Sequence, residues 1–431
     1  MSTVATVAKC SVADRATPAR RLLEGAGWSM AGAAAGQACV LLASVGIARV
    51  LGAERFGVFA FVQNTVNTAA NLAAVGLGLT AMRYLPVLRR EDPGMAASVL
   101  ALARRSAAVA GLLAAATLWL FGTGLGPAGI AGAFLLAGTV QQASAAGALL
   151  GLEQFAVAAQ LNALRGVLMA LLGFIGALVA GETAALGGLL AAVLVVWVTT
   201  ERTLRRACRR CGLPAIGVQC TPALPLLWKF SLPALANSLL AMPVHWAAQA
   251  FVLAAPGGLA ENGLLQAATV YRNAATFLPT QAGQAALPLI SAAKESRERR
   301  GLTAWSTGVA LATAVPVTAA VYVGRETLMA WFGPGFSAHS ELLLWTAPAG
   351  LLISLSLPAS QVLAASGRMW ICAAIQFLWA ALLLALAWTG LRAGEGAVAV
   401  VRAYVVAYAI YLVLNWAAAG FFALRPREVY R

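Results

Sequence analysis

Charged residues are scarce in this chain of 431 residues and make up only 10% of it. Hydrophobic residues make up 61%, and the mean hydropathy is +0.81. A water-soluble protein of this length needs a polar exterior, so the composition excludes an ordinary soluble domain. It predicts an all-α polytopic membrane protein, because apolar runs of about 20 residues are long enough to cross a bilayer as helices.

Acidic residues are the scarcer of the two charge types, with 15 Asp and Glu against 30 Lys and Arg. A net charge of +15 in a soluble protein would suggest a nucleic-acid partner. Here the basic residues lie mostly in segments between apolar runs, so no nucleic acid is expected. Their uneven distribution instead follows the positive-inside rule, and it predicts that both termini are cytoplasmic.

Signatures of enzymes and metal sites are also missing. The chain has two histidines, His245 and His339, and no phosphate-binding G-x-x-x-x-G-K-[ST] loop. The predicted outer loops are too short for a catalytic domain, so we expect neither an enzyme nor a bound cofactor. Cys208-x-x-Cys211, with Cys220 as the only near third ligand, leaves two alternatives open: a zinc site or unpaired reduced thiols in a cytosolic loop.

Twelve apolar stretches are predicted to span the membrane, in two sets of six. About 24 polar and basic residues precede the first, which is long enough to span, so no cleavable signal peptide is expected. We predict a cytoplasmic tail over 1–25, a six-helix bundle over 26–200, a cytoplasmic linker over 201–229, a second bundle over 230–423 and a tail over 424–431. The stretches are 26–50, 57–82, 103–122, 128–151, 157–180, 183–200, 230–254, 260–285, 303–323, 341–364, 369–390 and 397–423.

The two predicted bundles begin with the same pattern of residues, repeated 202 residues apart. Trp28-Ser29 opens the first and Leu85-Pro86 ends its second helix, whereas Phe230-Ser231 and Leu287-Pro288 do the same in the second bundle. The aromatic residue and the proline are 58 residues apart in both cases. Such a repeat predicts two similar halves around a pseudo-two-fold axis, an arrangement in which transporters bind substrate between the halves.

Two ionisable side chains fall in the middle of predicted spans of the second half. Arg272 lies roughly 18 Å into its span and has no carboxylate within one turn on the same helix. It could contact an anionic substrate, or it could tie helices together through an ion pair or carbonyl groups. His245 could bind a ligand or carry a proton, or it could be a histidine satisfied inside the bundle. Arg165 lies nearer the inner end of its span, where its side chain can extend to the membrane surface.

The polar membrane residues concentrate in the first, second, seventh and eighth spans, which carry the repeat, and three of these spans contribute candidate amide side chains. They could line a polar cavity, or they could form hydrogen bonds that hold the helices together. The candidates are Gln37 in the first span, Gln63, Asn64, Asn67 and Asn71 in the second, and Gln249 in the seventh.

Five short segments, in order along nearly the whole chain, resemble bacterial polysaccharide and O-antigen flippases. This family is part of the multidrug/oligosaccharidyl-lipid/polysaccharide exporter superfamily. The segments are ARVLGAERFGVFAFVQ (48–63), LLGLEQF (149–155), ATFLPTQAGQAALPLIS (275–291), WFGPGF (331–336) and LAASGR (363–368).

The resemblance implies twelve transmembrane helices in two six-helix bundles that form a V around a central cavity, as in MATE transporters. It also implies alternating access in the bacterial inner membrane and export of an undecaprenyl-diphosphate-linked glycan, with a polysaccharide polymerase among the assembly partners. Arg272, with Arg83 near the inner mouth, would then attract the diphosphate, and the amides would meet sugar hydroxyls. Two rival functions stay open: a cation-coupled multidrug exporter of the same superfamily, and a membrane glycosyltransferase or ligase.

Overall fold

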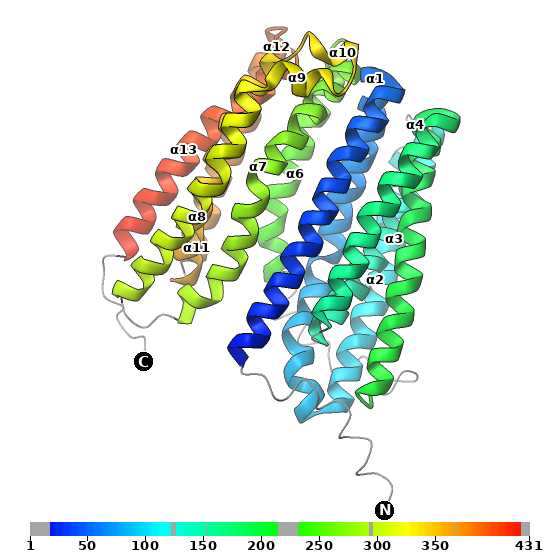
Figure 1. Cartoon of the computed structure of the whole chain (residues 1–431), viewed down its shortest axis with the longest axis vertical. Coiled ribbons are helices and arrows are strands. Elements are labelled where there is room, and N and C mark those ends of the chain that lie inside the picture. Colours follow the sequence, from blue (N-terminus) through cyan, green and yellow to red (C-terminus); the bar gives the residue numbers. More distant parts are fainter. Residues whose placement is uncertain are drawn as a thin grey trace, which may run out of the picture. The chain divides into compact units, whose positions relative to one another are not determined.

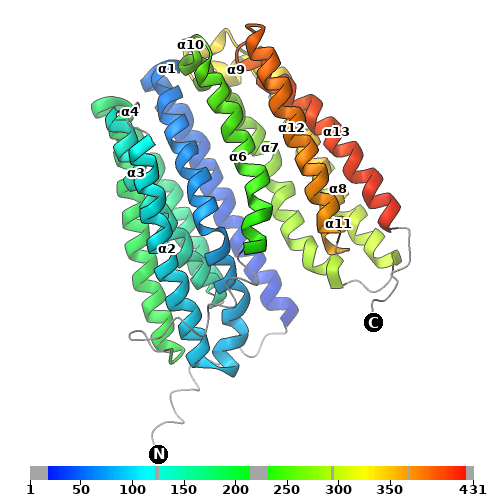
Figure 2. The same ribbon diagram turned by 180° about the vertical axis from the view of Figure 1, so that it is seen from behind.

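The fold consists entirely of helices within the described part of the chain (Figures 1 and 2). A computed structural model describes residues 18–121, 126–152, 154–213, 232–292, 296–366 and 368–423. The helices are α1 (Pro18–Glu91), α2 (Pro93–Phe121), α3 (Gly126–Gly151), α4 (Phe155–Arg210), α6 (Leu232–Ala254), α7 (Gly258–Ala292), α8 (Ser296–Val323), α9 (Arg325–Ala330), α10 (Pro334–Ser337), α11 (Glu341–Ala365), α12 (Met369–Arg392) and α13 (Ala397–Ala423).

Two of these helices are each two helices joined at a sharp break. In α1 the break is Gly52, whose φ of 73° lies in the left-handed region that glycine adopts without strain. In α4 it falls at Ala180 and Gly181, where Gly181 has a φ of 76°. When these two are counted as pairs, the long helices correspond one to one with the twelve predicted spans. The sequence-based prediction of an all-α membrane fold is therefore confirmed.

Eight helical segments in the described residues are long and apolar enough to cross a membrane. Two of them, Gly36–Ala73 and Ala156–Arg210, contain the breaks just described and thus each cover a pair of predicted spans. Large apolar side chains such as Val179, Val323 and Phe377 are exposed on these helices, as expected of surfaces that face lipid rather than water.

The chain divides into two compact units by its internal contacts. The first contains residues up to Ala43 together with Val62–Leu239, and the second contains Ser44–Phe61 together with Leu240–Arg431. In the first unit, α3 packs between α2 and α4. In the second, α11 is central and contacts α7, α8 and α13, and α12 packs on α13. The division of the chain into six-helix bundles over 26–200 and 230–423 stays a prediction.

The segment Ser44–Phe61, which turns at Gly52, is fixed to the rest of the second unit by a glycine crossing. A Cβ on Gly57 would overlap the carbonyl oxygen of Leu259, and a Cβ on Gly263 would overlap that of Ala53. The contact is therefore reciprocal. The glycine of each helix lies against the backbone of the other helix, at a position four residues before that helix's own glycine. Only residues without a side chain allow backbones to approach this closely.

Candidate functional site

Arg272 is buried in the interior of the second unit, with 8% of its surface exposed. Its guanidinium carbon lies 4.7 Å from the centre of the Tyr404 ring, which places the cation against an aromatic face. Arg272 takes part in none of the ion pairs found among the described residues. Its Nη1 is buried and has no hydrogen-bond partner there. The charge is therefore compensated by a ring face and by no described carboxylate.

His245 lies beside Arg272 and is held by hydroxyl groups at both ring nitrogens. The Tyr404 hydroxyl is 3.0 Å from Nδ1, and the Tyr408 hydroxyl is 3.2 Å from Nε2. In a neutral imidazole one nitrogen donates and the other accepts. One tyrosine therefore donates to the ring and the other accepts from it. Trp379 packs against the same imidazole, with the ring centres 5.5 Å apart.

Four helices bring this His245–Arg272 cluster together. His245 comes from α6, two residues after Pro243, and Arg272 comes from the middle of α7. Tyr404 and Tyr408 are four residues apart on α13, so they share one face of that helix. Trp379 comes from α12, which packs on α13. Gln249, one turn after His245 on α6, is buried as well.

The remaining predicted amides lie in the first unit. Gln37, Gln63 and Asn64 are half-buried on α1, whereas Asn67 and Asn71 are exposed. The Asn71 Nδ2 donates to the Asn67 carbonyl oxygen at 2.8 Å, which orders the end of this stripe. These amides and Arg272 belong to different units, and the polar cavity that they were predicted to line stays a prediction. Arg83 lies on α1, but its side chain is outside the described part.

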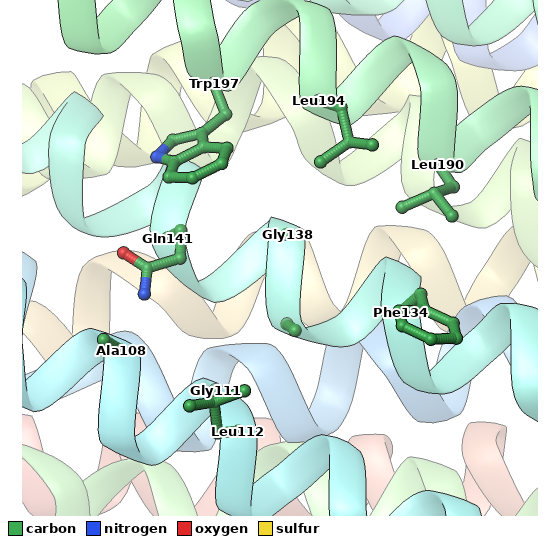
Figure 3. Close-up of a pocket in the computed structure, with 10 residues that line it drawn as sticks. Ala108, Gly111, Leu112, Phe134, Gly138, Gln141, Leu190, Leu194 and Trp197 are labelled. Atoms are coloured by element: carbon green, nitrogen blue, oxygen red, sulfur yellow. The ribbon is translucent and has the colours of Figure 1, made fainter.

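An apolar groove is present in the first unit, between α2, α3 and the second half of α4 (Figure 3). It measures about 300 Å³. Its walls include Leu112, Phe134 and Leu194, and its polar groups, Gln141 and Trp197, lie near each other at one end. None of the predicted site residues lines it.

The cysteine motif at the end of α4 shows no sign of a metal site within the part that the structure describes. Cys208 is buried and Cys211 is half-buried, and neither forms a disulfide within the described residues. No group of three potential ligands comes together among those residues. Cys220, the third candidate ligand, lies outside the described residues.

The sequence alone did not single out the aromatic partners of the cluster. Tyr404, Tyr408 and Trp379 stand in strongly apolar stretches, where aromatic residues are ordinary packing. One signal was available, because Tyr404, Tyr408 and Tyr411 repeat at helical spacing in a chain with only seven tyrosines. That spacing places three phenols on one side of the last span.

No protein-family model matches the chain. Among curated proteins it is similar to the "EPS I polysaccharide export inner membrane protein EpsE" of Ralstonia nicotianae, with 27% identity over 190 residues. The same-named protein of Ralstonia solanacearum is 29% identical over 192 residues. In both cases the match covers 43% of this chain and 43% of the relative, so less than half of either relative's length is matched.

Solved structures share the fold over nearly the whole length. An inward-facing multidrug resistance MATE family transporter of the MOP superfamily aligns with a TM-score of 0.70 and 14% identity, over 90% of this chain and 95% of that one. A MOP superfamily transporter from Pyrococcus furiosus aligns with a TM-score of 0.65 and 14% identity, over 95% and 97%. The predicted resemblance to polysaccharide exporters is confirmed, and the chain is a multi-pass membrane protein with the fold of MATE transporters.

Proposed function

We propose that the chain moves an undecaprenyl-diphosphate-linked oligosaccharide across the bacterial inner membrane by alternating access, in a pathway of polysaccharide export. Both termini are cytoplasmic in this proposal, and the polyprenyl chain stays in lipid while the diphosphate and the glycan cross. A polysaccharide polymerase and other assembly proteins would receive the product. The names of the two Ralstonia relatives support the export pathway.

The observation that carries the proposal is the buried charge of Arg272, which faces an aromatic ring and which no described carboxylate neutralises. A guanidinium in a membrane interior is costly and is retained where it has a partner or a function. No described carboxylate pairs with it, and Nη1 has no acceptor. A diphosphate supplies both negative charge and acceptor oxygens, and a guanidinium binds two of these oxygens at once.

The amides of the first unit fit the glycan part of the substrate. Asn67 and Asn71 are exposed on α1. Counted from the Gly52 break, Asn67 is about 22 Å along its helix, and Arg272 is about 21 Å from the start of α7. Exposed amides at that depth are unfavourable against lipid and favourable against water or sugar hydroxyls. We assign Gln37, Gln63, Asn64, Asn67, Asn71 and Gln249 to contacts with the glycan, and Arg83 to the inner mouth.

A flipping assay in proteoliposomes tests the proposal. The substrate is a fluorescent disaccharide on polyprenyl diphosphate, and a membrane-impermeant quencher reports the fraction that has crossed. Arg272→Ala should slow flipping by about 10- to 100-fold, the factor expected when a charge-assisted hydrogen bond is lost. Arg272→Lys should keep part of the activity, because it keeps the charge but not the two-pronged geometry.

Arg325→Ala is the matched control, since Arg325 pairs with the exposed Glu326 at the start of a short helix. It should flip at the wild-type rate. Wild-type flipping by a correctly folded Arg272→Ala protein would refute the diphosphate role and leave Arg272 as a brace between helices. Transport of cationic dyes without glycan flipping would favour the multidrug exporter, and sugar transfer by the purified protein would favour an enzyme.

A further inference from the structure

The His245–Arg272 cluster contains a histidine that the binding of a diphosphate by Arg272 does not use. Its ring lies in the interior of the second unit, between Tyr404 and Tyr408 of α13 and Trp379 of α12. Both ring nitrogens are already within hydrogen-bond distance of hydroxyl groups. A hydroxyl can either donate or accept. The ring can therefore gain a proton without losing either contact, because the hydroxyl that donated to it can turn and accept.

The charge near His245 determines when its ring can hold this extra proton. Of the side chains in contact with His245, Trp379 is neutral and Tyr404 and Tyr408 are phenols. The cation near the ring is Arg272, which lies on the face of the same Tyr404 whose hydroxyl reaches Nδ1. A protonated His245 would thus place a second positive charge beside a first, in a low-dielectric interior without a described carboxylate. Such a pair is unfavourable until an anion neutralises it.

We propose that His245 takes up a proton when a phosphate-type anion binds at Arg272, so that the site holds the two ligands together. This inference rests on the proposed diphosphate role of Arg272. The linkage is reciprocal: the anion favours the proton, and the proton favours the anion by the same factor. Binding of the lipid diphosphate would then bring a proton into the same site, and release of either ligand would favour release of the other.

The sign of the pH dependence follows from this linkage. Lower pH supplies the proton that stabilises the anion-bound state, so anion affinity should rise as pH falls. If one proton is taken up per anion, the dissociation constant changes by about tenfold per pH unit over the range where the free site is unprotonated. A site that binds the anion through Arg272 alone adds no pH dependence beyond that of the anion itself, because a guanidinium stays charged at every pH in this range.

Calorimetric titration of the purified full-length protein with inorganic pyrophosphate measures the number of protons taken up per anion and the change of anion affinity with pH. Titrations in buffers of different ionisation enthalpy give the number of protons taken up, and a series from pH 5.5 to 8 gives the slope. His245→Gln is the matched variant, since its amide can bond both tyrosine hydroxyls but does not titrate. Pyrophosphate's own protonation is common to both proteins, so it cancels in the difference.

The wild type should take up close to one proton more than His245→Gln and should show the steeper slope. Equal proton uptake and equal slopes in the two proteins would overturn the linkage and leave the diphosphate role standing. If the wild type and Arg272→Ala bind pyrophosphate equally well, the diphosphate role fails, and the linkage fails with it. Should His245→Gln not fold, Tyr404→Phe/Tyr408→Phe removes both hydroxyl partners. It should likewise flatten the slope, and an unchanged slope would count against the linkage.

Discussion

The glycine crossing offers a sharp test of how the second unit is held together. The change is Gly57→Ala, which adds one methyl group where α1 meets the start of α7. That methyl would overlap the Leu259 carbonyl oxygen and lie only 3.1 Å from the backbone nitrogen of Gly263. The neighbours are backbone atoms rather than the end of a flexible side chain, so they cannot turn aside. The two helices must instead move apart.

Three effects determine how much folding stability Gly57→Ala loses. Overpacking a tight contact costs about 1–3 kcal/mol. The separation also lengthens the bond from Asn262 Nδ2 to the Gly57 carbonyl oxygen, now 2.8 Å, and an orphaned buried donor costs about 1–3 kcal/mol. Asn262 is fully buried, so water cannot replace the lost partner. Alanine's better helix propensity returns up to about 1 kcal/mol. We expect a net loss of about 2–4 kcal/mol.

Thermal unfolding of the detergent-solubilised protein is the assay. The Tm of Gly57→Ala should fall by about 5–10 °C. Gly308→Ala is the control, because Gly308 lies mid-helix in α8 with no atom within 4 Å of a new Cβ. It should leave the Tm unchanged or raise it slightly. If Gly57→Ala melts together with Gly308→Ala, the close backbone contact does not exist in the folded protein.

Two further predictions concern the second unit's helix ends and the membrane topology. Glu261→Gln should lower the stability by about 1 kcal/mol in the same melting assay, because the Glu261 carboxylate accepts the Ala397 backbone N–H at 2.6 Å at the start of α13. The control Glu298→Gln, at an exposed glutamate, should leave the stability unchanged. Equal effects of the two changes would exclude the capping role of Glu261. Reporter fusions after residues 90, 210 and 298 should be cytoplasmic and fusions after 125 and 257 periplasmic, and an inverted pattern at any of them would contradict the proposed topology.

The sequence was sufficient for the class of fold and for the helix pattern. Apolar runs separated by basic segments predict membrane helices, because the cost of burying charge in hydrocarbon leaves few alternatives. The breaks inside α1 and α4 fall between predicted spans, where Gly52 and Gly181 supply backbone conformations with positive φ. Arg272 and His245 also stood out without a structure, since polar groups are rare at that depth.

Tertiary structure decided what surrounds these residues. Tyr404 lies 159 residues from His245 along the chain, and no local pattern indicates that a given phenol will face a given imidazole. The pairing depends on how α6, α7, α12 and α13 pack, and therefore on the shapes of many apolar side chains at once. The same holds for Gly57 and Gly263. Glycine is common in the sequence, and only the crossing of two helices shows which glycines the backbone contact requires, because steric exclusion acts between segments that are distant in the chain.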